Sequence, residues 1–221
     1  MGDRGECLKL LFDLGNEDSQ AYYNLETLCL CFPGRISGSD ILESALDYLI
    51  ELGPKMGLSR AREEEVLNVP QWVRGDSDQE KLFVEIGSDS MWPKPNPSSR
   101  VIRIMANGLS PGTSTGGLKG PMITFKSIEE MKLLGASEVT GKVVLLNYGH
   151  YTTYGDLSGS IRGMGAREAS KLGAIAYLNR AITPDGSLSG LHTGTISDFT
   201  DDCKPIPTAC VTIEDAELLT R

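Results

Sequence analysis

The most informative pattern of apolar and polar positions lies at residues 139–178. A continuous apolar run at 143–146 is bounded by polar and glycine residues, which indicates a strand buried on both faces. Apolar residues then recur at helical spacing over 161–172, with Arg162 among the polar residues of the other face. After a helix-stopping glycine, a second apolar run covers 174–178. This order predicts strand, helix and strand, and therefore a parallel pair with a crossover helix.

Amphipathic helices are predicted in the first part of the chain. Residues 6–30 carry leucines at helical spacing, with an interruption at 15–19. Ser39 can cap a further helix, which we expect to end at Gly53-Pro54. That helix separates apolar and polar sides more cleanly than any other segment of the sequence.

Short strands and turns predominate after these helices. Capping-box spacing predicts that helices begin after Ser127 and Thr212. The change from helical to strand-and-turn composition predicts a boundary near 75–78, and hence a mixed α/β (α+β) protein with parts 1–76 and 77–221. Further strands are predicted at 81–86, 100–106 and 122–125, with a last strand and helix over 207–219.

Composition and charge narrow the class of protein. The 221 residues are 40% hydrophobic and 23% charged, which is typical of a globular protein in water. The net charge of -9 opposes binding to nucleic acid or to anionic membranes. No apolar run approaches the roughly 18 to 20 residues that span a bilayer, and the amino terminus shows no long apolar core of a secretory signal. We therefore expect neither nucleic acid nor a membrane as a partner.

The cysteines give little evidence of a disulfide framework or a metal site. Five cysteines leave one over, so they cannot all pair. Cys29 and Cys31 form the only close pair, and a C-x-C without a second pair of ligands is weak evidence for metal. We interpret them as small buried hydrophobic residues near a helix end.

Two glycine-rich segments were compared with phosphate-binding motifs, and neither fits. In the loop 112–120, Leu118 separates the glycine pair from Lys119, and a glycine stands where a P-loop needs a hydroxyl. After the glycines of 163–165, Glu168 occupies the third glycine position of the dinucleotide fingerprint. A cytosolic nucleotide-binding protein is therefore the weakest functional alternative.

The sequence supplies no recognisable catalytic or metal-binding set. The two histidines, His150 and His192, lie in predicted loops and outside H-E-x-x-H or H-x-D, whereas a hydrolytic zinc site needs about three protein ligands. No G-x-S-x-G elbow is present for a nucleophile triad. Tyr148, Tyr151 and Tyr154 could line a cleft beside His150, although packing of the loop is the simpler interpretation. We assign no catalytic, metal-binding or substrate-binding residue.

Four strings do carry a family resemblance: PGRISGSDILESALDYL, VPQWVRG, VTGKVVLLN and IPTACVTIEDAE. The first two resemble the start of the peptidase domain in the secreted and lysosomal zinc metallopeptidases related to carboxypeptidase Q. The last two resemble the protease-associated domain inserted in those enzymes. The resemblance covers about Cys7 to Arg221. It implies that 1–76 form the helical start of the exopeptidase domain and that 77–221 form most of the insert.

The resemblance implies an α/β zinc exopeptidase that cleaves dipeptides or short peptides with free ends. Such enzymes use two zinc ions bridged by a carboxylate, with a Glu as general base. In that family the ligands follow the insert, so no ligand or base is carried over onto this sequence, and the 221-residue chain alone is expected to bind no zinc and to be inactive. Peptide substrates, a homodimer and an extracellular or lysosomal location are further implications, although the sequence shows neither a secretory signal nor an N-x-[ST] acceptor.

Two further expectations accompany this interpretation. The alternative function is a non-catalytic protease-associated binding module, a decoy or partner made from a shortened transcript. The apolar face of the helix after Ser39 would normally pack on the catalytic sheet. We therefore expect the first seventy or so residues to be poorly packed in this chain.

Overall fold

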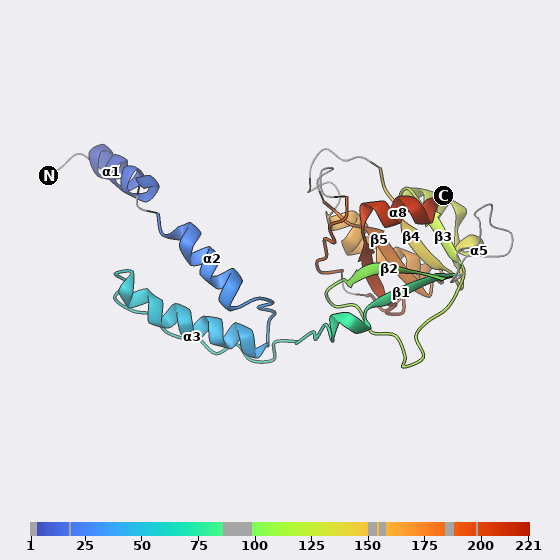
Figure 1. Cartoon of the computed structure of the whole chain (residues 1–221), viewed down its shortest axis with the longest axis horizontal. Coiled ribbons are helices and arrows are strands. Elements are labelled where there is room, and N and C mark those ends of the chain that lie inside the picture. Colours follow the sequence, from blue (N-terminus) through green and yellow to red (C-terminus); the bar gives the residue numbers. More distant parts are fainter. Residues whose placement is uncertain are drawn as a thin grey trace. The chain divides into compact units, whose positions relative to one another are not determined.

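The computed structural model divides into two compact units, Met1–Val73 (unit 1) and Arg74–Arg221 (unit 2) (Figure 1). No helix of the described residues is long and apolar enough to cross a membrane. The residues described are 4–17, 19–85, 99–149, 154, 158–183, 188–197 and 199–221.

Unit 1 contains the predicted helices and a non-helical segment that follows them over 56–73. Ser39 caps the third of them, because its hydroxyl accepts a hydrogen bond from the Leu42 N–H at 3.3 Å. That helix includes Pro54 and ends slightly later than predicted, since a proline in the last turn removes only one N–H donor. The Met56 N–H still reaches the Leu52 carbonyl at 3.1 Å. The helices are α1 (Arg4–Glu17), α2 (Ala21–Cys31) and α3 (Asp40–Lys55).

The helices of unit 1 bury little of their surface. No residue of α1 or α2 is buried, and α3 buries only Ala45 and Gly53. The prediction that Cys29 and Cys31 are buried is therefore wrong: both are exposed, because α2 has no buried face.

Unit 2 is built on one mixed six-stranded sheet with the order β1-β2-β6-β5-β4-β3. β3 to β6 are mutually parallel along this order, whereas β2 runs antiparallel to both β6 and β1. The predicted parallel pair is confirmed, with Val143 opposite Ala176. The strands are β1 (Lys81–Glu85), β2 (Ser99–Ala106), β3 (Met122–Phe125), β4 (Val143–Leu146), β5 (Ala176–Arg180) and β6 (Thr208–Val211).

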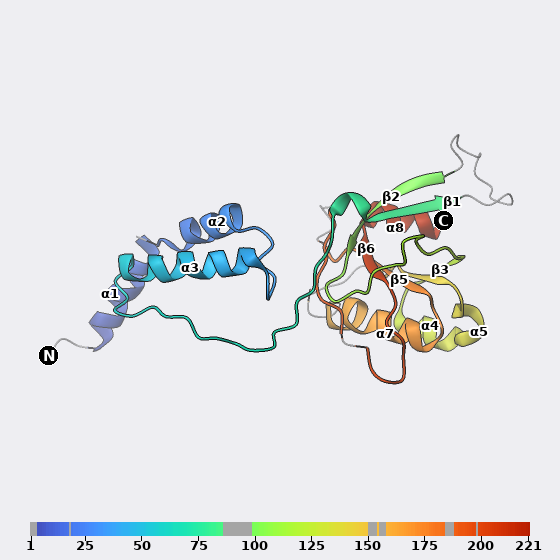
Figure 2. The ribbon, with the colours of Figure 1, turned by 90° about the horizontal axis from the view of Figure 1, so that it is seen from below.

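Helices cover both faces of this sheet (Figure 2). On one side, α4 (Ile128–Leu134), α5 (Ala136–Val139) and α7 (Gly165–Lys171) lie over the core cluster that contains Val144 and Leu146. On the other, α8 (Ile213–Thr220) lies over the cluster that contains Leu145. Successive residues of β4 thus enter opposite cores, as the continuous apolar run predicts.

The crossover helix between β4 and β5 differs from the prediction at its start. The segment η2 (Ser158–Met164) is π-helical, and the regular helix α7 begins only at Gly165. The Ile161 carbonyl accepts a hydrogen bond from the Tyr177 hydroxyl at 2.7 Å, so the ring of a sheet residue inserts beside this turn. Gly173, at φ 84°, ends the helix as predicted.

Both predicted capping serine and threonine residues cap their helices. The Ser127 hydroxyl accepts from the Glu130 N–H at 3.0 Å, and the Thr212 hydroxyl accepts from the Asp215 N–H at 3.0 Å. The return bond of the first capping box differs from the expected one, because the Glu130 carboxylate accepts from the Lys126 N–H at 2.6 Å. The cap therefore extends one residue further back, to Lys126, which directly follows β3.

Candidate functional site

The sequence candidates fall in different places. His192 lies in a polar cluster on unit 2, whereas His150 and Tyr151 lie outside the described residues. Lys119 of the glycine-rich loop forms an exposed ion pair with Glu85 at 2.7 Å, and the loop leads into a strand, as expected. Across the described ranges, no group of three or more His, Cys, Asp or Glu side chains could hold a metal ion.

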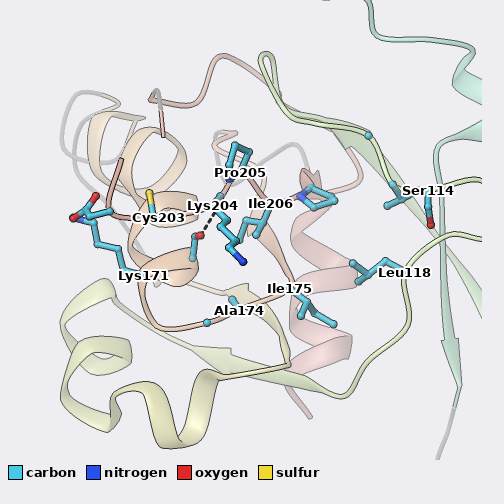
Figure 3. A pocket seen from close by; sticks show the side chains of 15 residues that line it. Ser114, Leu118, Lys171, Ala174, Ile175, Cys203, Lys204, Pro205 and Ile206 are labelled. Carbon is cyan, nitrogen blue, oxygen red and sulfur yellow. Dashed lines mark hydrogen bonds and ion pairs between the residues drawn. The ribbon is translucent and has the colours of Figure 1, made fainter. Parts of the chain in front are cut away.

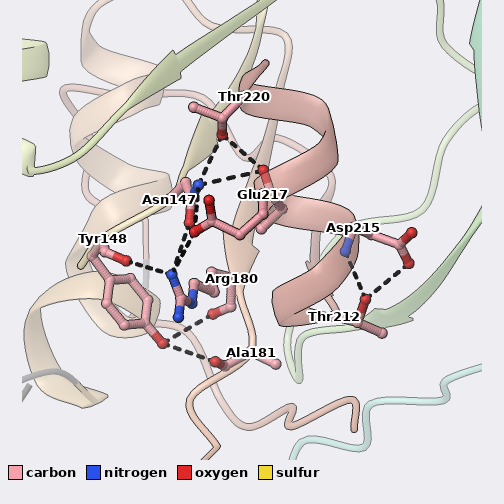
Figure 4. A network of polar contacts seen from close by, with 9 residues as sticks. Asn147, Tyr148, Arg180, Ala181, Thr212, Asp215, Glu217 and Thr220 are labelled. Carbon is pink, nitrogen blue, oxygen red and sulfur yellow. Dashed lines mark hydrogen bonds and ion pairs between the residues drawn. The ribbon is translucent and has the colours of Figure 1, made fainter. Parts of the chain in front are cut away.

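A polar network joins the carboxyl ends of β4 and β5 to α8 (Figure 4). The Arg180 guanidinium donates to Glu217 Oε1 at 3.0 Å and to the Tyr148 carbonyl at 3.1 Å. The Asn147 amide donates to Thr220 Oγ1 at 2.8 Å. Parallel sheets usually bind ligands at this end. Here the polar groups bind one another, so we assign the network a structural role.

For Tyr148, the simpler interpretation of packing is confirmed. Its ring is buried, and its hydroxyl donates to the Ala181 carbonyl at 2.9 Å. The Arg180 guanidinium lies 5.7 Å from the centre of the same ring. Tyr148 therefore packs the end of β4 against β5 and does not line a cleft.

A second cluster surrounds Arg162 and is called the Arg162 cluster, comprising Arg162, Tyr154, His192 and Thr193. The π-helical segment η2 supplies Arg162, which is 8% exposed. Its Nη1 donates to the Thr193 carbonyl at 3.2 Å and lies 3.4 Å from His192 Nδ1. Its Nη2 donates to the Tyr154 hydroxyl at 3.0 Å, while its Nε is buried without a hydrogen-bond partner in the described part of the chain.

The loop that carries His192 is held against the end of β2. The Thr193 hydroxyl donates to the Ala106 carbonyl at 2.6 Å, and the Gly108 N–H donates to the Gly194 carbonyl at 2.9 Å. A buried amide pair lies beside these bonds, since the Asn107 side chain donates to that of Asn179. The sheet thus fixes the loop at several points.

Two titratable groups in or beside the cluster have shifted pKa values. Burial, and then the neighbouring Arg162 cation, lower the pKa of His192, which favours its neutral form. Burial raises the pKa of the Cys210 thiol on β6 to about 11. A hydrogen bond from the His192 backbone only partly opposes that rise. Neither group is therefore activated as a nucleophile. The distinctive chemical group of the cluster is the buried Arg162 guanidinium cation.

We expect iodoacetamide to label Cys7, Cys29 and Cys31 of the folded chain and to spare Cys210. The first three are exposed, whereas Cys210 is fully buried and its raised pKa leaves little thiolate near pH 8. Peptide mapping by mass spectrometry at timed intervals measures the labelling, with a urea-unfolded sample as the control. Equal labelling rates for Cys210 and Cys29 would contradict this burial.

An open groove of about 660 Å³ lies before the amino-terminal ends of β5 and β6 (Figure 3). Ala174 and Ile206 form a buried apolar floor, and Leu118 of the glycine-rich loop lines one side. Lys171 and Asp202 form an ion pair at 2.8 Å at its rim. Lys204 also lines the groove, but the floor is apolar and the Asp202 carboxylate is already paired with Lys171, so we assign the groove no chemistry.

Sequence reasoning missed Arg162. Its spacing predicts the polar, solvent-facing side of a helix, but the structure buries it. The reason is η2, because the extra residue in a π-helical turn rotates the following side chains relative to a regular helix. The glycines of this segment are compatible with such a turn but do not specify it.

Comparison with known proteins relates the whole chain to one group of peptidases. It is 32% identical over 220 residues to human carboxypeptidase Q, covering 100% of this chain and 43% of that protein. It is also 32% identical over 207 residues to the mouse protein, covering 94% and 40%. The Xenopus laevis protein is 32% identical over 224 residues, covering 98% and 43%. No family model matches.

Solved structures show the same fold. A peptidase M28 precursor from Shewanella amazonensis superposes with a TM-score of 0.74 at 20% identity, covering 97% of this chain and 46% of that one. A zinc aminopeptidase from Bacillus subtilis superposes with a TM-score of 0.56 at 20% identity, covering 91% and 40%. The chain is therefore a homologue of carboxypeptidase Q with the fold of M28 peptidase structures, and it spans about two-fifths of the length of the relatives that it matches.

Proposed function

We propose that the chain forms the amino-terminal part of a zinc-dependent exopeptidase of the carboxypeptidase Q kind, which hydrolyses dipeptides or short peptides with free ends. The observation that carries the proposal is the 32% identity to carboxypeptidase Q along the full chain. Residues 1–76 would belong to the peptidase domain. Residues 77–221 would form a protease-associated insert that shapes the access of substrate. An extracellular or lysosomal location and a homodimer belong to the same proposal.

The described residues do not fit a pair of zinc ions. No cluster of three or more potential ligands occurs among them, and His192 contacts an arginine. The proposal therefore assigns the zinc ligands to the part of the relatives' length that this chain does not match. In that arrangement, residues of this chain bind the substrate and shape its access to the active site, and they do not supply the general base.

The surface of unit 1 supports this division. Its helices expose large apolar side chains within residues 4–73, as expected of helices that cover another domain. Burying a large apolar side chain stabilises a protein by about 1.5 to 3 kcal/mol, so such a surface favours association with further structure. Side chains of this kind include Leu11 (62% exposed), Phe12 (72%), Tyr22 (79%) and Leu30 (74%).

The test is an assay of the native polypeptide that carries this sequence, isolated with an antibody against unit 2. We expect it to hydrolyse dipeptides with free ends, to lose this activity with a zinc chelator and to regain it with zinc. Dipeptides blocked at both ends are the control and should remain intact. A native polypeptide without chelator-sensitive turnover would refute the proposal and support a non-catalytic binding module.

The recombinant 221-residue chain provides the second arm of this test. Supplied with zinc at the same molar concentration, it is expected to show no turnover, because the described residues lack a ligand set. Chelator-sensitive turnover by this chain alone would contradict the assignment of the zinc ligands to the unmatched part.

A further inference from the structure

Arg162 differs from Arg180 and Arg167 of unit 2 in its distance from carboxylates. Arg180, with a side chain 14% exposed, pairs with Glu217 at 3.0 Å, and Arg167, 25% exposed, lies 3.8 Å from Glu168. Arg162 is 8% exposed, yet no carboxylate lies within 4.0 Å of it among the described residues. A buried charge is costly unless an opposite charge compensates it. Arg162 is therefore a buried cation without a neighbouring opposite charge among the described residues, and it is suited to bind an anion.

The unpaired side of the guanidinium has a specific geometry. Nη1 is engaged by the Thr193 carbonyl and by His192 Nδ1. Nε has no partner, and the neighbouring Nη2 binds only the neutral Tyr154 hydroxyl. The Nε–H and one Nη2–H of an arginine point the same way and match the two oxygens of a carboxylate. A carboxylate that replaced the Tyr154 hydroxyl would thus receive two parallel hydrogen bonds.

The guanidinium is also held rigidly. A Cβ added to Gly194 would lie 2.3 Å from Arg162 Cζ, so only glycine allows the backbone to lie this close to it. The loop of Gly194 is itself bonded to Gly108 and Ala106 at the end of the sheet. Preorganisation of this kind favours binding, since little side-chain freedom remains to be lost.

Access lies on the side of Tyr154. This residue is 48% exposed and its ring contacts His192 edge-on, with ring centres 5.6 Å apart. Rotation of this exposed tyrosine away from the cluster would release Nη2 for a ligand. π-Helical turns such as η2 are also frequent at functional sites.

We infer that Arg162 is a recognition residue for the free carboxyl end of a short peptide, which binds its Nε and Nη2 in place of the Tyr154 hydroxyl. The inference rests on the proposed function for the choice of a peptide as the source of the carboxylate. The flat two-donor edge favours a carboxylate, and the neighbouring aromatic ring of Tyr154 offers contact to the last side chain of the peptide.

The 221-residue chain and the dipeptide Ala-Leu test this inference directly. Buried arginine Nε–H groups give distinct resonances in ¹H–¹⁵N NMR spectra. We expect the free dipeptide to shift the Arg162 Nε resonance in a saturable way, and its carboxamide to leave it unchanged. Arg162→Lys keeps the charge but removes the paired donors, and should weaken binding by about tenfold or more.

Two variants serve as controls for a merely structural role. Arg167→Lys changes an arginine already paired with Glu168 and should bind the dipeptide like the wild type. Tyr154→Phe removes the competing hydroxyl while keeping the ring, and should bind as tightly or more tightly. If Tyr154→Phe weakens binding as much as Arg162→Lys, the hydroxyl is a ligand contact and the proposed exchange is wrong.

The remaining outcomes decide between the peptide and a carboxylate of the chain itself. Asp156 precedes Arg162 by six residues and is the acidic neighbour to test. If Asp156→Asn shifts the Arg162 Nε resonance and no dipeptide does, the partner is internal and the inference is overturned. Equal shifts by the dipeptide and its carboxamide would overturn it as well. Because the readout is binding, these failures are separate from a failure of the turnover assay.

Discussion

Replacing Gly165 by alanine is expected to lower the free energy of unfolding of unit 2 by about 2 to 4 kcal/mol. A Cβ at this position would lie 2.0 Å from the Tyr177 hydroxyl oxygen and 2.5 Å from its ring carbon Cζ. Either α7 moves off the sheet, or the Tyr177 ring moves and loses its bond to the Ile161 carbonyl. Alanine's better helix propensity, about 1 kcal/mol, offsets only part of this cost.

Urea unfolding of the full chain, followed by circular dichroism, measures this effect. Gly116→Ala is the matched control, because no atom lies within 4 Å of its added Cβ, and its change should stay within about 0.5 kcal/mol. In a Tyr177→Leu background the clash disappears, so Gly165→Ala should cost at least about 1 kcal/mol less than in the wild type. Equal costs in both backgrounds would show that Tyr177 is not the group that Gly165 accommodates.

The strand, helix and strand unit could be predicted because its signal is local. Each residue of the run 143–146 meets a core on one face or the other, so every position is apolar. The order of the six strands could not be predicted in this way. Ile104 lies opposite Val211 in the sheet, and no local period of the sequence records that pairing.

The candidate site was harder to predict than the fold. Helical spacing placed Arg162 on a solvent-facing side, and only the π-helical turn, stabilised beside Tyr177, brings it inward. Its partners Tyr154 and His192 are far apart in the sequence, and the position of His192 depends on bonds from its loop to the end of β2. The same limitation explains Cys29: apolar spacing predicts which face of α2 could be buried, but does not show that anything covers it.

Amide hydrogen exchange in β4 of unit 2 is expected to be slower than in the helices of unit 1 by about a thousandfold or more. In β4, Val144, Leu145 and Leu146 are fully buried, so their amides should exchange only through openings close to global unfolding, about 5 to 15 kcal/mol. No residue of α1 or α2 is buried, so local fraying should suffice for exchange there. Isolated helices of this length are marginal in water.

The hydrogen-exchange protection of α3, compared with that of β4, tests how well unit 1 is packed. This helix has a bonded cap at Ser39, but buries only Ala45 and Gly53, so its protection should lie well below that of β4. Mass spectrometry of peptic peptides, with rates referred to the urea-unfolded chain, resolves the three helices and the sheet. Protection across Ile41 to Ile50 equal to that of β4 would contradict the expectation that unit 1 is poorly packed. Low protection would instead fit helices whose apolar faces are completed by structure beyond the described residues, as the exopeptidase proposal requires.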